Sequence, residues 1–193
     1  MLNRKGLIIF FPLFLFGICG FSQVKYEMEI SVKEDQVPGN ALKVIDNFNF
    51  NKKVKWYKEF GLDDTTYEAK TKYQGKKYSV EFSTEGSLED VEIRTKEKSI
   101  PTPSLNKMGE LLASRFSKYR LRKIQIQYLG DPNVMLTSIR SGKLLPGVVK
   151  NYEIVVVGKV DKSYKAIEFL FSEEGDLILS REIIERRQDH IEF

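Results

Sequence analysis

Apolar positions recur along this chain in two similar series, and each series predicts an amphipathic helix followed by several strands. The first series opens at Val37 and the second at Ile100, and a proline follows each of these residues. Apolar residues spaced by three or four positions are typical of a helix with one buried face. They are Val37, Ala41, Val44, Ile45 and Phe48 in the first series, and Leu105, Met108, Leu112 and Phe116 in the second.

Strict alternation of polar and apolar residues after each helix predicts strands with one buried and one solvated face. In the first series these strands cover about 54–59, 67–73, 77–83 and 87–95, with turns at Gly75 and Gly86. One break in the alternation predicts a bulge near Glu89 or Asp90. The aromatic residues in the buried phase are Trp56, Tyr67, Tyr73, Tyr78 and Phe82.

Matching segments in the two series indicate an internal duplication. The stretch 171–177 keeps the Phe, Ser, Gly and Leu of 82–88 in register. We therefore predict an α+β fold, a tandem repeat of a helix followed by a four-stranded antiparallel sheet, in which the two sheets could join edge to edge. The predicted parts are an N-terminal edge strand and lead-in at 24–36, repeats at 37–97 and 98–184, and a charged tail at 185–193.

The second repeat contains an insertion at about 130–147, which the first repeat lacks. It is too apolar to lie comfortably in water, since it carries Met135, Leu136, Ile139, Leu144 and Leu145. Long connections without secondary structure of their own are usually functional or disordered. Two interpretations stay open, a longer hairpin packed on its own sheet and a contact surface for another protein.

The first 23 residues predict a cleaved secretory signal peptide. A short basic start precedes the apolar run 7–16, and small residues lead to a cleavage site near Ser22 and Gln23. The apolar run is shorter than the roughly 20 residues that a membrane-spanning helix needs, so no stable membrane insertion is expected after cleavage. Cys19 raises the option of lipidation, which the Ile18 before it disfavours. The mature protein is predicted to be periplasmic or secreted.

Charge and cysteine content exclude several classes of function. The chain of 193 residues has a formal net charge of +4, and two of its bases leave with the signal peptide. The remaining charge alternates in sign, unlike the basic stripe of a nucleic-acid-binding protein. The one cysteine, Cys19, also leaves, which excludes thiol catalysis and Cys-ligated metals. The one histidine, His190, lies in the charged tail. No cofactor or metal is predicted.

Paired carboxylates are the one catalytic chemistry that the composition leaves open. The candidates are Glu68, Glu81 and Glu153, which lie in the solvated phase with lysines between them. Such a pattern is typical of cross-strand charge pairing. The sequence therefore predicts a protein that is not an enzyme.

Several of these segments resemble a known family, the PepSY-like domains of exported proteins from Bacteroidetes-type bacteria. The resemblance lies in Val37-Pro38 before a helix, in the strand segments 54–59, 67–70 and 78–82, and in the turn at Gly86. The group is also called beta-lactamase-inhibitor-like, because its helix-plus-four-strand unit occurs as a tandem pair in the beta-lactamase inhibitory protein. The resemblance implies this fold over about residues 30–184 and implies no catalytic residues.

The leading hypothesis is an exported, non-enzymatic module that recognises, or inhibits, another protein. The candidate surface is the open sheet face, with Lys55, Tyr57, Lys70 and Glu81, together with the 130–147 loop. Tyrosine favours the centres of interfaces, which draws attention to Tyr57 in the solvated phase. The alternative is a carrier or sensor of small molecules, lipids or peptides in the cell envelope, which would need an apolar cavity between helix and sheet.

Overall fold

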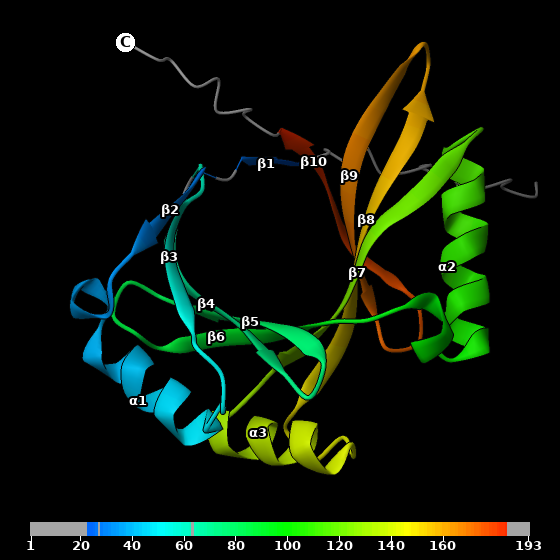
Figure 1. Ribbon diagram of the computed structural model, residues 1–193. Coiled ribbons are helices and arrows are strands. Elements are labelled where there is room, and N and C mark those ends of the chain that lie inside the picture. The colour runs from blue at the N-terminus through cyan, green and yellow to red at the C-terminus, as the bar shows by residue number, and fades with distance from the viewer. Residues whose placement is uncertain (1–22, 27, 63, 185–193) are drawn as a thin grey trace, which may run out of the picture.

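The computed structural model describes residues 23–26, 28–62 and 64–184, and their strands form one ten-stranded sheet (Figure 1). The strands are β1 (Gln23–Tyr26), β2 (Met28–Val32), β3 (Lys55–Phe60), β4 (Thr65–Tyr73), β5 (Lys76–Phe82), β6 (Leu88–Arg94), β7 (Tyr119–Leu129), β8 (Val149–Val160), β9 (Ser163–Ser172) and β10 (Leu177–Ile184). The α-helices are α1 (Gly39–Phe48), α2 (Thr102–Arg115) and α3 (Pro132–Ser141), and short 3₁₀ turns occupy Glu34–Gln36 and Glu97–Ser99. The signal-peptide segment 1–22 and the tail 185–193, with Cys19 and His190, lie outside the described residues.

The sheet curls until its two edges approach each other (Figure 1). Its strand order is β1-β10-β9-β8-β7-β6-β5-β4-β3-β2, in which β6 and β7 pair antiparallel and join the two halves edge to edge. The N-terminal segment was predicted as one edge strand, and the structure shows two edge strands there. It divides into β1, which runs parallel to β10, and β2, which runs antiparallel to β3, so consecutive strands supply both edges of the sheet.

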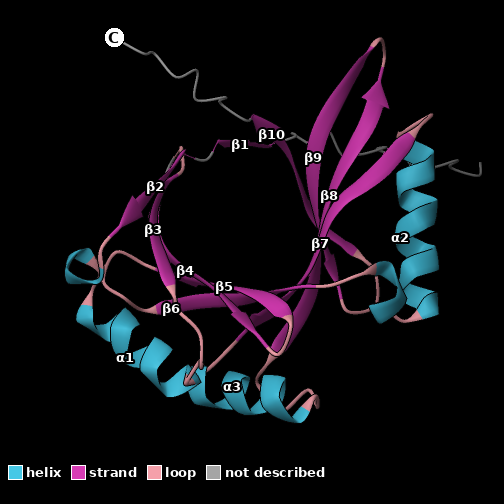
Figure 2. Cartoon of the chain, viewed as in Figure 1, coloured by secondary structure: helices cyan, strands magenta, loops and turns pink. Residues whose placement is uncertain are grey.

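The helices lie outside the curve of the sheet, and apolar residues fill the space beneath them (Figure 2). The first core cluster joins α1 and α3 to β3–β6, and the second joins α2 to β7–β9. The predicted core aromatics Trp56, Tyr78 and Phe82 are buried in the first cluster, and Tyr67 and Tyr73 pack against it. The apolar phase of the strands is therefore the outer, helix-covered face.

The 130–147 insertion is not a hairpin: its residues 132–141 form α3, and 142–147 connect this helix to β8. Asp131 caps α3, because its side chain accepts hydrogen bonds from the backbone N–H groups of Asn133 and Val134. Arg140 donates to the carbonyl oxygen of Phe48 at the end of α1, at 2.9 Å. Met135 is fully buried in the first cluster. An insertion in the second half thus completes the core of the first half.

Two turns that contain glycine pack in the same way against the N-terminal ends of α1 and α2. Gly86 (φ +82°) and Gly175 (φ +87°) each follow a strand of the apolar core, and both have the left-handed backbone that favours glycine. The Asn40 side chain donates to Glu85 O near the first turn, and the Ser104 hydroxyl donates to Glu173 O at the second. The predicted bulge is confirmed at Glu89, since Asp90 pairs with Glu81 and Leu88 pairs with Phe82.

Replacing Gly86 with alanine is expected to lower the free energy of unfolding by about 1–3 kcal/mol. A Cβ at this position would lie 2.9 Å from the backbone nitrogen of Ala41, in addition to the strained backbone angle. Gly75 is the matched control, because its φ is also positive and a Cβ there meets nothing within 4 Å. Urea denaturation measures both variants. Equal losses for the two would show that close docking onto α1 contributes nothing.

The start of α2 differs from the expectation in one detail. The pair Thr102-Pro103 favours an N-cap at Thr102 and a helix whose first residue is Pro103. Instead Pro101 occupies the cap position, and Thr102 is the first helical residue, with no side-chain cap hydrogen bond. The second half shares with the first a helix followed by four strands, but all strands belong to one sheet. The duplication itself stays a prediction.

Candidate functional site

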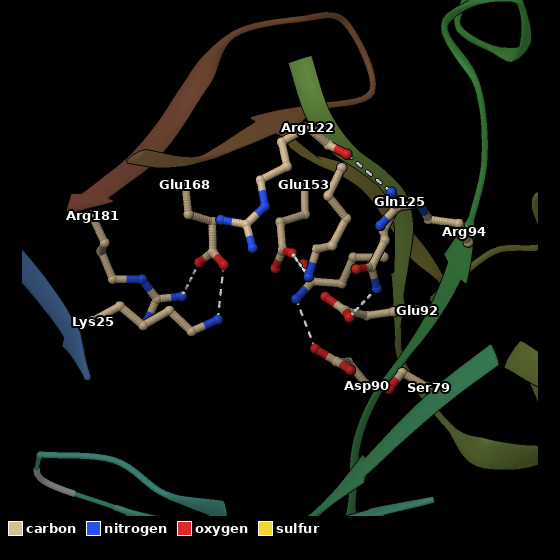
Figure 3. Close-up of polar contacts among 12 residues, drawn as sticks. Lys25, Ser79, Asp90, Glu92, Arg94, Arg122, Gln125, Glu153, Glu168 and Arg181 are labelled. Carbon is tan, nitrogen blue, oxygen red and sulfur yellow. Dashed lines mark hydrogen bonds and ion pairs between the residues drawn. The ribbon is translucent and has the colours of Figure 1, made fainter. Parts of the chain in front are cut away.

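Polar side chains from the inner phase of the strands meet on the concave face of the sheet (Figure 3). Strand register brings them together pair by pair, because residues directly opposite each other share a face. Glu81 lies opposite Asp90, Gln125 opposite Glu153, and Glu168 opposite Arg181. The solvated face expected from the sequence is therefore the inside of a curved sheet.

Three buried carboxylates on this face, Glu68, Glu153 and Glu168, are held by a cation. Glu153 is 5% exposed and lies 2.9 Å from the Lys123 ammonium. Glu168 is 4% exposed and binds Lys25 at 2.8 Å and Arg181 at 3.0 Å, which ties β1 and β10 to β9 (Figure 3). Removing one partner of such a pair leaves the other charge buried without a counter-ion. These pairs therefore stabilise the curled arrangement.

Three neighbouring acids lack a cation as their nearest partner. Asp90 and Glu92 are buried and accept hydrogen bonds from the amide groups of Gln127 and Gln125. Burial, aided by the nearby Glu153 and Glu89 and opposed by the Gln127 hydrogen bond, raises the pKa of Asp90 to about 6. Burial and neighbouring carboxylates also raise the pKa values of Glu81 and Glu92 well above their usual range. In contrast, burial would raise the pKa of Glu153, but Lys123 and Lys25 bring it below its usual range.

A pocket of about 620 Å³ opens at one rim of the concave face. Its rim is the end where β3 and β5 begin and β4 and β6 end, and its inner wall includes Ser79, Glu92 and Gln125. Pockets of this volume hold small organic ligands. The complete lining is Lys52, Lys53, Lys55, Glu68, Lys70, Thr71, Lys72, Lys77, Tyr78, Ser79, Glu92, Arg94, Lys123 and Gln125.

A second, smaller pocket of about 370 Å³ lies at the other rim, beside the β3–β4 turn. Acidic side chains dominate its polar lining, with Glu59, Asp64, Glu81 and Glu89 against Lys25 and Arg181. The concave face therefore has a basic end and an acidic end. This separation of charge arises only in the assembled sheet, because the residues at each end come from several strands.

The predicted contact residues on the sheet lie on the concave face. Tyr57 stacks under the Lys70 ammonium, which lies 4.9 Å from the centre of its ring. Lys70 also pairs with Glu68 at 2.6 Å and with Glu29 at 2.7 Å. Lys55 and Lys70 line the larger pocket, and Glu81 lines the smaller one.

The predicted contact residues of the insertion do not form an exposed patch. Met135 is fully buried, and Leu136 and Ile139 pack against the first core cluster. Leu144, in the connection after α3, is 44% exposed, and Leu145 is half-buried. Met135 therefore has no surface to offer a partner, because its apolar side chain fills the core beside α1.

Two of the three candidate carboxylates, Glu68 and Glu153, are held in ion pairs, whereas Glu81 lies opposite Asp90 and lines the smaller, acidic pocket. Glu68 accepts a short hydrogen bond from Ser79 and pairs with Lys70, while Glu153 pairs with Lys123. A general acid needs a raised pKa and a free path to substrate, which an ion-paired carboxylate lacks. Oxygen atoms of Glu29, Glu59 and Glu68 come within 4.8 Å of one another, but the Lys70 ammonium already lies between Glu29 and Glu68.

Several residues of this face were not singled out from the sequence. They are Lys25, Asp90, Glu92, Lys123, Gln125, Asn151, Glu168 and Arg181. The available signal was the neutral polar residues Ser79, Gln125 and Asn151 in the inner phase, where a solvated strand usually carries charges. Each of them is buried.

Within the described part of the chain, every helix is too short or too polar to cross a bilayer. No family model matches the sequence, and no curated protein matches it.

Solved structures with the same fold come from Bacteroides species. A protein from Bacteroides eggerthii described as periplasmic is 14% identical, with a TM-score of 0.52 over 76% of this chain and 88% of that chain. A DUF2874 family protein from Bacteroides uniformis has the same identity and TM-score over 76% of this chain and 89% of that chain. A BLIP-like protein from Bacteroides fragilis is 16% identical, with a TM-score of 0.49 over 80% and 92% of the two chains. The two structures with a TM-score of 0.52 show a mixed α+β fold for this chain, and at these identities the likeness extends no further than the fold. It gives no support to the PepSY-like name.

Proposed function

We propose that the chain is an exported, non-enzymatic binding module that holds a polar ligand on the concave face of its sheet. The pocket of about 620 Å³ at the basic rim carries this proposal, because it is the larger of the two pockets on that face. Its walls are strands of a continuous sheet, a rigid scaffold that positions side chains well for recognition. Export rests on the predicted signal peptide. The tandem origin of the two halves and kinship with PepSY-like domains belong to the same proposal.

The ligand is expected to be polar because most residues that line the pocket carry a charge, an amide or a hydroxyl group, and Tyr78 is the one member of the apolar clusters in the described lining. The carrier hypothesis formed from the sequence required an apolar cavity between helix and sheet. That space is filled by Trp56, Met108 and the other core residues. The concave face offers amides, hydroxyls and charges, which bind sugars, phosphates or peptides and not lipid tails.

A ligand screen on the purified mature chain tests this proposal. Compounds that bind only the folded state raise the unfolding midpoint by mass action. We expect at least one class of polar solute to raise it and to slow amide hydrogen exchange in β4 and β5, which wall the pocket. Protection confined to the outer face of the helices, or no effect from neutral, cationic and anionic panels alike, would contradict the proposal.

Recognition of a protein partner is the second candidate. One observation favours it: Leu144 and Val149 are exposed apolar residues that flank the end of the α3 connection, at 44% and 54%. Deleting 130–147 would remove Met135 from the core, so it cannot serve as a test. A pull-down from envelope fractions with Leu144→Asp and Val149→Asp variants avoids this problem, and a partner retained by both variants would count against this surface.

A further inference from the structure

We propose that the larger pocket binds a solute carrying two or more phosphate or sulfate groups. This inference rests on the proposed function and names the chemistry of its ligand. Eight of the fourteen residues lining the pocket are cationic, and two, Glu68 and Glu92, are acidic. The cations come from the loop before β3 and from strands β3, β4, β5, β6 and β7. The fold therefore collects positive charge at one place from many parts of the sequence.

Strand register places like charges directly opposite each other in this pocket. Lys55 lies opposite Lys70 in the β3–β4 pair, and Lys72 lies opposite Lys77 in the β4–β5 pair. Such pairs destabilise a sheet, because the two ammonium groups repel at short range. A bound anion would reduce the repulsion between Lys72 and Lys77, whereas Lys70 already has Glu68 and Glu29 beside it.

Internal ion pairs neutralise only the inner cations. Lys70 is held by Glu68 and Glu29, and Lys123 by Glu153. Among the described residues, no acidic group forms an ion pair with Lys52, Lys53, Lys55, Lys72 or Lys77. All five are exposed at the mouth of the pocket, so their charges are available to a ligand.

The loop that supplies two of these lysines is held in place. The Thr71 hydroxyl donates to Lys53 O at 3.1 Å, which fastens the 52–53 loop to β4. Thr71 itself is buried and lines the same pocket. The backbone of Lys53 is therefore held at the rim of the pocket, and a loop that is already in place loses less entropy when a ligand binds.

The inner wall limits how far an anion can enter. Glu92 is 6% exposed and accepts a hydrogen bond from Gln125, and Glu68 is 4% exposed. A negative group pushed against these carboxylates would be repelled. The anionic groups should therefore stay at the mouth among the five exposed lysines, with any neutral part of the ligand directed inward. Several negative groups on one molecule match five separated cations better than a single carboxylate does.

Calorimetry on the mature chain tests this assignment with defined probes. The anionic probes are inorganic pyrophosphate and a sulfated heparin disaccharide, and an unsulfated disaccharide of the same size is the neutral control. A Lys72→Gln/Lys77→Gln double variant should bind the anionic probes about tenfold more weakly, which corresponds to about 1.4 kcal/mol. Higher salt should weaken binding by the wild type, because salt screens charges exposed to solvent.

A matched control makes the same change of charge elsewhere. Lys159→Gln/Lys162→Gln alters the β8–β9 hairpin, whose residues do not line the pocket. This control should bind as the wild type does. The Lys72/Lys77 double variant should also unfold at a higher temperature than the wild type without ligand, since the opposed charges are gone. Weaker binding by a variant that unfolds at a higher temperature cannot be attributed to a loss of folded protein.

The outcomes separate this inference from the proposed function. Binding of the neutral disaccharide with equal or higher affinity, unchanged in the double variant, would overturn the anion assignment and leave the binding module standing. No binding of any solute in the screen would overturn both. Vesicles containing phosphatidylglycerol form a last arm. Binding of vesicles and not of soluble probes, lost in the double variant, would support the phosphate chemistry and assign it to a lipid headgroup.

Discussion

Replacing Met135 with alanine is expected to lower the free energy of unfolding by about 2–5 kcal/mol. The side chain is fully buried between α3 and the first core cluster, so its removal leaves a cavity. The expected loss is large because Met135 belongs to α3, whose apolar face completes the core that α1 and β3–β6 form. Chemical denaturation followed by tryptophan fluorescence is a direct measurement, since Trp56 lies in the same cluster.

Leu144→Ala is the matched control for this substitution. Leu144 belongs to the same insertion but is 44% exposed, so its truncation should change stability by less than about 0.5 kcal/mol. If instead Met135→Ala left stability unchanged and abolished capture of a protein partner, the insertion would be a contact surface as first hypothesised. The two variants thus distinguish a helix that fills the core from a segment that binds a protein partner.

Lowering the pH from about 8 to about 5 is expected to stabilise the protein. Glu81, Asp90 and Glu92 have raised pKa values in the folded state, owing chiefly to burial. Between the ordinary pKa of an acid and its raised folded value, the folded state binds more protons than the unfolded state. Stability therefore falls as the pH rises through this window. For Asp90 the window extends from 3.8 to about 6. The lowered pKa of Glu153 acts in the opposite sense, and only at more acidic pH.

Asp90→Asn should remove part of this dependence. At about pH 8 we expect the variant to be more stable than the wild type by about 1–3 kcal/mol, because a neutral amide no longer repels the Glu81 that lies opposite. Near pH 4 the two proteins should converge. Glu110→Gln on α2 is the control, as Glu110 is exposed. Unfolding curves recorded across the pH range provide the measurement, and a wild type that gains stability steadily up to pH 8 would refute the prediction.

Local features of the fold could be predicted from the sequence because they depend on neighbouring residues. The bulge at Glu89 follows from one break in the alternation, and the burial of Trp56 and Phe82 follows from their phase. The start of α3 was missed although Asp131-Pro132 is a common cap and first residue of a helix. The same residue types are also common in turns, so the local sequence alone does not distinguish a turn from the start of a helix.

The closure of the sheet could not be predicted in the same way. The alternation of polar and apolar residues shows which face of a strand is polar. It does not show whether that face contacts water or the polar side chains of another strand. Glu92 and Gln125 look like solvated residues in isolation, yet they are buried against each other. The basic pocket depends on the same closure, since its lysines belong to separate strands that only the curled sheet brings to one rim.

The parallel pairing of β1 with β10 has a consequence for the order in which the protein folds. Gln23 pairs with Arg181 and Tyr26 with Ile184, so the first and last described strands need each other. Contacts between residues so distant in sequence form slowly, because a long loop must close first. During synthesis, β1 has no neighbour in the sheet until β10 has been made, so this edge is expected to be among the last parts of the sheet to form.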